Sequence, residues 1–128
     1  MEIDEISGMV VDECIAIHRE LGPGLFENVY EVILAGRLER RGLRVERQVA
    51  VPIEFDGHAF GAAFRIDILV EGRLILEVKA VERLNQTHVR QLVTYLRLMK
   101  QPVGLLLNFS HATMKDGIRR VANEYNSG

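Results

Sequence analysis

Two carboxylates and one ammonium group lie close together in the middle of the chain, where they could bind a metal ion and act on a phosphodiester. Asp67 is followed ten residues later by Glu77 and then by Lys79. Two carboxylates can share a hard cation such as Mg²⁺, which polarises a phosphodiester oxygen and lowers the pKa of a bound water. The carbonyl of Val78 could add a ligand, and Lys79 could orient the water or stabilise developing charge. An isolated pattern of this kind is more often a solvated strand face, so its surroundings must decide.

The alternation of apolar and polar residues places these groups on one face of a β-hairpin. Directly opposed residues of an antiparallel pair point to the same side, so a two-residue turn at Glu71-Gly72 would mix the two faces. An odd-length loop or a bulge over 70–73, with Gly72 in the left-handed region, keeps both acids and the lysine together. The even-numbered residues of the hairpin, expected to pack on one core, are Phe64, Ile66, Ile68, Val70, Leu74, Leu76 and Val78.

Three further polar side chains could face the same cluster. Gln91 and Tyr95 are four residues apart on the next expected helix, so they share one of its faces. Glu27, near the start of an earlier helix and beside Tyr30, could add a third carboxylate. Each has an ordinary explanation, as a surface polar residue or as a first-turn Glu favoured by the helix dipole. The combination points to a site more strongly than any single member does.

The elements that must position these groups follow from the hydrophobic period. Apolar residues recur at helical spacing in four segments and at a period of two, or as short apolar runs, in four others. Pro52 indicates an edge strand or a bulge, and Asp56-Gly57 is a strong hairpin turn signal. The expected helices are Ile3–Leu21, Leu25–Arg41, a helix capped by Asn85 or Thr87 that runs to Met99, and Met114–Tyr125. The expected strands are Leu43–Phe55, Phe60–Val70, Arg73–Val78 and Val103–Leu107. This order predicts one α/β domain over residues 1–128.

Composition excludes several classes of protein. The chain has 128 residues, of which 48% are hydrophobic, and its single thiol, Cys14, rules out an internal disulfide and a cysteine-cluster zinc site. No apolar run approaches the roughly 20 residues of a membrane span, and the first residues do not resemble a signal peptide. We therefore expect a soluble cytoplasmic protein without a membrane partner. The histidines, at positions 18, 58, 88 and 111, lack metal-ligand spacing. His18 is expected to pack or hydrogen-bond, and Asn108 to bind backbone.

The charge of the chain restricts its possible partners less than its composition does. The formal net charge is −2, so the chain is not a globally basic nucleic-acid domain. Five arginines nevertheless fall within eleven positions, and Arg is well suited to bidentate phosphate contacts. They form either a phosphate-binding patch or a solvated helix end interleaved with Glu39 and Glu46. These five are Arg37, Arg40, Arg41, Arg44 and Arg47.

The combined series resembles the PD-(D/E)XK nuclease superfamily. The resemblance lies in Asp67, in the Glu-Val-Lys of 77–79, and in Gln91 with Tyr95. More narrowly, the Gly-Leu-Phe-Glu-Asn-Val-Tyr of 24–30 is similar to the signature of the GxxExxY family, a small bacterial family within that superfamily. The flanking residues 18–24 and 104–109 also fit, and the similarity runs from about Met9 to Asn123. Ile66 stands where the superfamily's name-giving proline occurs.

The resemblance implies a restriction-endonuclease-like fold, in which a mixed sheet flanked by helices has an α-β-β-β-α-β core. It implies Mg²⁺ or Mn²⁺ as cofactor and nucleic acid, with DNA expected, as the partner. Because no separate DNA-recognition domain is present, sequence specificity would need a homodimer or a partner protein. The implied catalytic residues are Asp67, Glu77, Lys79, Glu27, Gln91 and Tyr95, and the expected metal ligands are Asp67, Glu77, Val78 and Glu27.

The first functional hypothesis is therefore a Mg²⁺- or Mn²⁺-dependent nuclease that hydrolyses nucleic-acid phosphodiesters. The alternatives are a non-catalytic nucleic-acid- or nucleotide-binding module, or an assembly module, that retains the nuclease fold. Asp67, Glu77 and Lys79 are all present, and a purely structural module would not need them. Their presence favours the enzyme.

Overall fold

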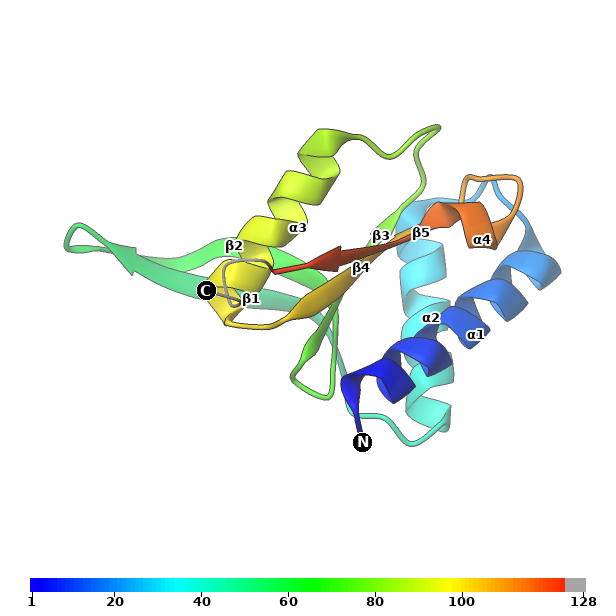
Figure 1. Cartoon of the computed structure of the whole chain (residues 1–128), viewed down its shortest axis with the longest axis horizontal. Helices are drawn as coiled ribbons and strands as arrows, with labels where there is room; N and C mark the ends of the chain where they lie inside the picture. Colours follow the sequence, from blue (N-terminus) through cyan, green and yellow to red (C-terminus); the bar gives the residue numbers. More distant parts are fainter. Residues whose placement is uncertain (124–128) are drawn as a thin grey trace.

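A five-stranded mixed sheet with helices on both faces forms the framework of the chain in a computed structural model that describes residues 1–123 (Figure 1). The strands lie in chain order, and every neighbouring pair is antiparallel except β3 and β4, which are parallel. The helices are α1 (Ile3–Leu21), α2 (Glu27–Arg40), α3 (Gln86–Met99) and α4 (Met114–Gly117). The strands are β1 (Val45–Phe55), β2 (His58–Val70), β3 (Leu74–Lys79), β4 (Val103–Asn108) and β5 (Ile118–Ala122). The expected α-β-β-β-α-β core is confirmed as α2, β1, β2, β3, α3 and β4.

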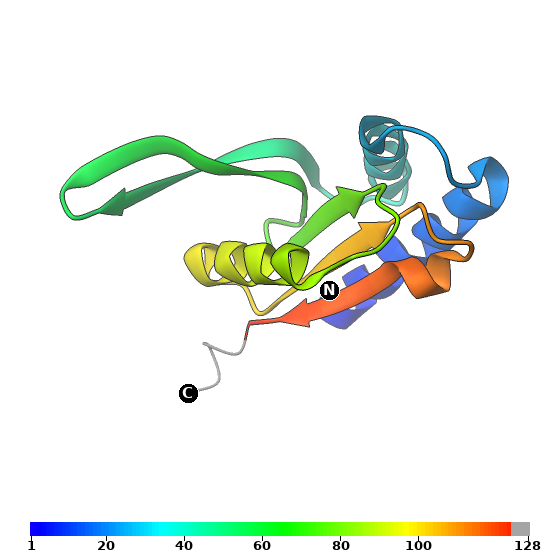
Figure 2. The same cartoon turned by 90° about the horizontal axis from the view of Figure 1, so that it is seen from above.

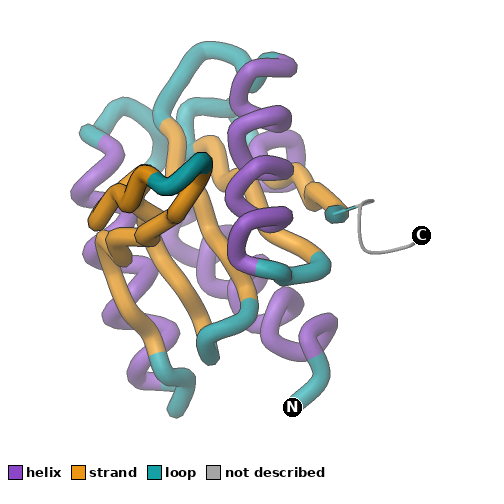
Figure 3. The backbone as a smooth tube through the Cα atoms, turned by 90° about the vertical axis from the view of Figure 1, so that its left-hand side faces the viewer, coloured by secondary structure: helices purple, strands orange, loops and turns teal. Residues whose placement is uncertain are grey.

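The sheet separates two apolar cores. One core joins the buried stripes of α1 and α2 to one face of β3 and β4. The second core joins α3 to the other face, and Figure 3 shows this helix in front of the sheet with the others behind it. Because β3 and β4 are covered on both faces, nearly all of their residues are buried, as is usual for parallel strands. Among the described residues, no helix is long and apolar enough to cross a membrane.

The hairpin between β2 and β3 has the predicted odd loop. Val70 pairs with Leu74, so three residues form the connection, and Asp67 falls opposite Glu77 when the register is extended. Glu71 and Gly72 both have positive φ, 55° and 65°, and the N–H of Arg73 donates to the carbonyl of Val70. The prediction of an odd loop with Gly72 in the left-handed region is confirmed.

The prediction that all seven apolar residues of this hairpin share one core is wrong in part. Ile68 packs with α1 and α2, whereas Phe64 and Ile66 pack with α3. The side chains of β2 change from one core to the other at Asp67. The facing strand β1 is irregular at the same place, since Gln48 has a φ of 52° and the pairing of the two strands is interrupted there. A backbone break opposite a candidate catalytic acid leaves no trace in hydrophobic alternation.

Beyond this break, β1 and β2 continue as a two-stranded arm that extends away from the helices (Figure 2). β1 is an edge strand, and the register shifts between Val51 and Ile53, on either side of Pro52. The indication of an edge or a bulge at this proline is therefore confirmed. The tip is closed by Asp56 and Gly57, both with positive φ, as in a type I′ turn.

The expected closing helix over Met114–Tyr125 is wrong over most of its described part. A single turn, α4, ends at Gly117, and β5 follows and pairs with β4. A Cβ at Gly117 would lie 2.1 Å from the carbonyl oxygen of Asn108, so only glycine allows the chain to pass this close. The buried β4 needs partners for its backbone on both sides, and β5 supplies the second set. Tyr125, the expected end, lies outside the described residues.

Candidate functional site

The candidate site lies where β2 and β3 separate. Backbone pairing between the two strands ends at Ile68 and Leu76, and two carboxylates bridge the gap that follows. The N–H of Asp67 donates to Glu77 Oε2 at 3.0 Å, and the N–H of Val78 donates to Asp67 Oδ2 at 2.9 Å. The acids thus replace ladder hydrogen bonds, and each carboxylate is held by a backbone N–H of the opposite strand. The predicted pairing of Asp67 with Glu77 follows directly from the register of the hairpin.

Burial disfavours the ionised form of both acids. Glu77 is only 4% exposed, and burial, with the nearby charge of Asp67, raises its pKa to about 8. The pKa of Asp67 is also raised, mainly by burial and further by the charges of Glu31 and Glu27. The ammonium of Lys79 acts in the opposite direction on both carboxyls, which places it near them. Lys79 is half-buried and forms no ion pair within residues 1–123, so its charge is available to a ligand.

The donor set fits a hard divalent cation. Asp67 Oδ1 and Glu77 Oε1 accept no hydrogen bond from any described residue. Because every buried side-chain nitrogen or oxygen in that part of the chain has a partner, these two oxygens reach solvent. Mg²⁺ usually takes one or two protein carboxylates and keeps several waters, so two converging acids suffice. Over residues 1–123, no group of three or more acidic, His or Cys side chains converges as a metal site, so Glu27 does not complete such a group.

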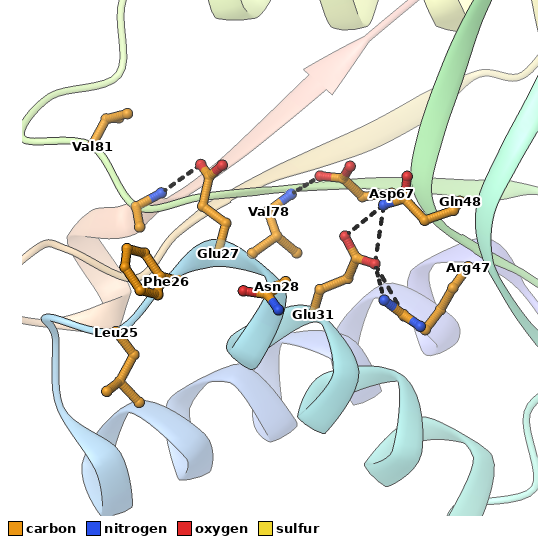
Figure 4. A pocket seen from close by; sticks show the side chains of 11 residues that line it. Leu25, Phe26, Glu27, Asn28, Glu31, Arg47, Gln48, Asp67, Val78 and Val81 are labelled. Atoms are coloured by element: carbon orange, nitrogen blue, oxygen red, sulfur yellow. Dashed lines mark hydrogen bonds and ion pairs between the residues drawn. The ribbon is translucent and has the colours of Figure 1, made fainter.

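Glu27 lies at the first turn of α2, across a cleft of about 760 Å³ that also includes Asp67 (Figure 4). Its carboxylate accepts the N–H of Ala80 at 3.0 Å, just beyond the end of β3. This contact ties the helix to the strand that carries Glu77 and Lys79. The structure therefore brings Glu27 to the same cleft as Asp67, whereas Glu77 lies outside the cleft lining and connects to it through Asp67.

A buried acid that the sequence analysis missed also lines this cleft. Glu31 is 5% exposed, and its carboxylate accepts from Arg47 at 2.7 and 3.0 Å and from the Gln48 amide at 3.0 and 3.1 Å (Figure 4). These contacts hold Gln48 in its left-handed conformation, in register with Asp67. The available signal was positional, since Glu31 precedes Leu34 and Leu38 by three and seven residues on the buried stripe of α2.

The tyrosine of the 24–30 segment fixes the loop in front of the site. Tyr30 is fully buried and stacks on Phe109, with ring centroids 4.4 Å apart. Its hydroxyl donates to the carbonyl of Gly22 at 2.6 Å and accepts the N–H of Leu25 at 3.2 Å. Gly24, with a φ of 108°, takes a conformation that other residues rarely adopt. The glycine, the glutamate and the tyrosine of this segment thus serve one structure, the rim of the cleft.

The two predicted residues of α3 differ in their placement. Tyr95 stacks on Phe64, with ring centroids 4.1 Å apart, and its pKa is raised by burial and by the charges of Glu77 and Asp67. Tyr95 therefore lies near the acids, as expected. Gln91 is exposed, and its side chain forms no hydrogen bond within the described part of the chain, so the structure does not bring it into the cluster.

The remaining predicted contacts are structural. His18 Nε2 lies 2.9 Å from the carbonyl oxygen of His111, as the hydrogen-bonding prediction requires. Asn108 is fully buried, and its amide bonds both backbone groups of Val81, at 3.1 and 2.8 Å. His88 forms a capping box with Asn85 at the start of α3. The preference for packing or backbone roles is confirmed for His18 and Asn108.

Most of the arginine stretch is already paired. Arg37 bonds Glu20 at 2.8 Å, and Arg41 lies 3.4 Å from Glu13. Arg47 is bound to Glu31, as described above. The partners come from α1 and α2 rather than from Glu39 and Glu46. Two members, Arg40 and Arg44, are exposed and form no ion pair with any of residues 1–123.

Comparison with known families agrees with this geometry. The family model of the PD-(D/E)XK nuclease superfamily matches residues 4–121, which is nearly the whole chain. The chain belongs to this superfamily, and its mixed sheet flanked by helices has the restriction-endonuclease-like architecture. A search of curated proteins and a search of solved structures each gave no match.

Proposed function

We propose that this chain is a divalent-metal-dependent nuclease that hydrolyses phosphodiester bonds in DNA. The observation that carries the proposal is the bridge between Asp67 and Glu77, which holds two carboxylates together while one oxygen of each stays open to solvent. We further assign the chain to the GxxExxY branch of its superfamily. In support, Gly24, Glu27 and Tyr30 all shape the rim of the cleft at this site.

Asp67, Glu77 and the carbonyl of Val78 are the proposed ligands for Mg²⁺ or Mn²⁺. A metal bound there supplies a water of lowered pKa and polarises a phosphate oxygen. A bound cation would favour the ionised form of both buried acids, because burial raises both pKa values and the charge of Asp67 further raises that of Glu77. Glu27 is held by Ala80 outside any three-carboxylate group, so we propose that it acts on a coordinated water rather than directly.

The other proposed residues act on the substrate and the water. Lys79, half-buried and without an ion-pair partner in residues 1–123, orients the attacking water or stabilises charge on the phosphate. Burial and the charge of Glu77 raise the pKa of the Tyr95 phenol, which is protonated at neutral pH and can donate a hydrogen bond to the substrate. Gln91 is exposed on the same helix, and its proposed role is to contact a bound nucleic-acid strand.

A nuclease assay on variants of Asp67 and Lys79 tests the proposal. Wild type is incubated with single-stranded DNA, duplex DNA and RNA in Mg²⁺, in Mn²⁺ and in EDTA. Asp67→Asn should abolish metal-dependent cleavage, and Lys79→Met should lower it roughly 10²-fold while metal affinity is kept. Matched controls are Asp56→Asn at the tip of the arm and Lys115→Met on α4, both exposed and outside the cleft.

The same assay separates the enzyme from the alternative. Metal-dependent cleavage that persists in Asp67→Asn would contradict the proposed active site, and equal activity in Lys79→Met would remove the lysine from the mechanism. A wild-type protein that binds DNA but cleaves none of the substrates with either metal would be a binding module that retains the fold. A homodimer or a partner protein stays a prediction, which sedimentation of the full chain with and without DNA would address.

A further inference from the structure

The aromatic residue at the rim of the cleft is almost fully exposed. Phe26 is 83% exposed, more than any other large hydrophobic residue that the structure describes as exposed. It is the N-cap residue of α2 and immediately precedes Glu27. Single exposed hydrophobic residues are common on protein surfaces, so exposure alone indicates nothing. What distinguishes Phe26 is that it lines the same cleft as Asp67 and Glu27.

The backbone on both sides of Phe26 is anchored. Before it, the N–H of Leu25 donates to the hydroxyl of the buried Tyr30 at 3.2 Å. After it, the carboxylate of Glu27 accepts the N–H of Ala80 at 3.0 Å. The ring is therefore presented from a rigid segment, and little conformational entropy is lost when a ligand covers it.

The segment at Val81, which lines the cleft beside Phe26, is also held by hydrogen bonds to a buried residue. Val81, which follows the end of β3, donates its N–H to the side-chain oxygen of the buried Asn108 and accepts a hydrogen bond from the side-chain NH₂ of the same residue. Figure 4 shows Phe26 on the side of the cleft toward Val81, with Glu27 between it and Asp67. An exposed aromatic ring, apolar side chains from Leu25 and Val81, and one of the acids that would hold a metal, Asp67, thus line one cleft.

We propose that Phe26 is a stacking platform for an unpaired base of a DNA strand whose phosphodiester lies at Asp67. This inference rests on the proposed function and deepens it, because it names single-stranded or frayed DNA as the substrate class. Inside a duplex the faces of the bases are covered by neighbouring base pairs, so an aromatic ring can stack only on a base that is unpaired or extruded. Stacking does not depend on base identity and needs no separate recognition domain.

Equilibrium binding in EDTA, where metal-dependent cleavage does not occur, tests the inference on the full chain. The probes are a twelve-nucleotide oligothymidylate and a duplex of the same length, with oligouridylate as the RNA arm. Removing one stacked base contact costs about 1–3 kcal/mol, so Phe26→Ala should weaken binding of the single strand about 5- to 150-fold. Phe26→Tyr should restore most of it. Phe60→Ala is the matched control, because it removes another exposed phenyl ring, on the arm and outside the cleft.

The absence of tryptophan from the chain provides a second readout. In Phe26→Trp the new side chain is the only tryptophan, and its fluorescence should be quenched by the single strand but not by the duplex. Phe60→Trp should show no quenching with either. Single-strand affinity of Phe26→Ala within twofold of wild type, a wild type that binds only the duplex, or unquenched fluorescence would each overturn the inference. If those results came with Asp67-dependent cleavage, the proposed function would stand without the stacking platform.

Discussion

Replacing Glu77 with Gln should make the fold more stable at neutral pH, although the residue is buried and hydrogen-bonded. The amide keeps an oxygen for the N–H of Asp67, which Glu77 Oε2 accepts at 3.0 Å, and it removes the carboxyl that titrates. Burial and the charge of Asp67 raise the pKa of Glu77 from its ordinary value of 4.5 to about 8. Ionising this group therefore opposes folding, and neutral Gln avoids the cost.

The direction and the size follow from proton linkage. Below pH 4.5 Glu77 is protonated in both states and contributes nothing, and between pH 4.5 and 8 the folded chain holds about one proton more than the unfolded chain. The free energy of unfolding then falls by up to about 1.4 kcal/mol per pH unit, and the loss is complete above pH 8. Between pH 5.5 and 7.5 the wild type should lose roughly 2.5 kcal/mol that Glu77→Gln keeps.

Urea denaturation in EDTA at pH 5.5, 6.5 and 7.5 measures this difference. With a denaturant slope of about 1–3 kcal/mol per molar, the midpoints of variant and wild type should diverge by roughly 0.8–2.5 M over the range. Glu54→Gln, which removes an exposed carboxyl of the arm, controls for the loss of one acidic group. If the midpoints of Glu77→Gln and wild type stay parallel, Glu77 does not titrate in this range, and the electrostatic account of the site is wrong.

Three further predictions follow from the site and its supports. Mn²⁺ binding should weaken at least tenfold in Asp67→Ala. In the wild type at pH 7, Mn²⁺ binding should release close to one proton, because the raised pKa of Glu77 keeps most of that carboxyl protonated without metal. Calorimetry in buffers of different ionisation enthalpy measures both the affinity and the proton release. Tyr30→Phe should cost about 1–3 kcal/mol in urea denaturation, because the two backbone groups that the hydroxyl bonds lose their partner, and an unchanged midpoint would mean that the hydroxyl does not hold the loop. Reversing Arg40 and Arg44 to Glu should weaken DNA binding and flatten its salt dependence by about two units if both touch phosphate, whereas an unchanged slope would make them ordinary surface charges.

Part of the site could be read from the sequence because it depends on local rules. The period of two between Phe64 and Lys79 specified an odd loop, and that loop sets Asp67 opposite Glu77. The helical period likewise located α1, α2 and α3 to within about two residues. Residue type then suggested the chemistry, since two carboxylates can share a divalent cation and a nearby ammonium group can stabilise charge on a phosphate.

Elements that depend on distant partners were missed or misplaced. β5 follows a glycine after one helical turn, and only the open edge of β4 makes a strand more favourable there than the expected helix. Glu31 was missed because the residues that bind its carboxylate, Arg47 and Gln48, lie on a strand far along the chain. Neither outcome is encoded within a window of neighbouring residues.

The sequence by itself determined which groups are present and which of them share a strand face or a helix face. It therefore indicated a metal-binding pair of acids with a lysine, and it assigned the backbone role of Asn108. Only the tertiary structure decided that β2 and β3 separate at Asp67, so that carboxylates replace ladder bonds and their pKa values rise. The physical reason is that burial, strand separation and electrostatic coupling depend on segments far apart in the chain, such as α2 and β3 at Glu27 and Ala80.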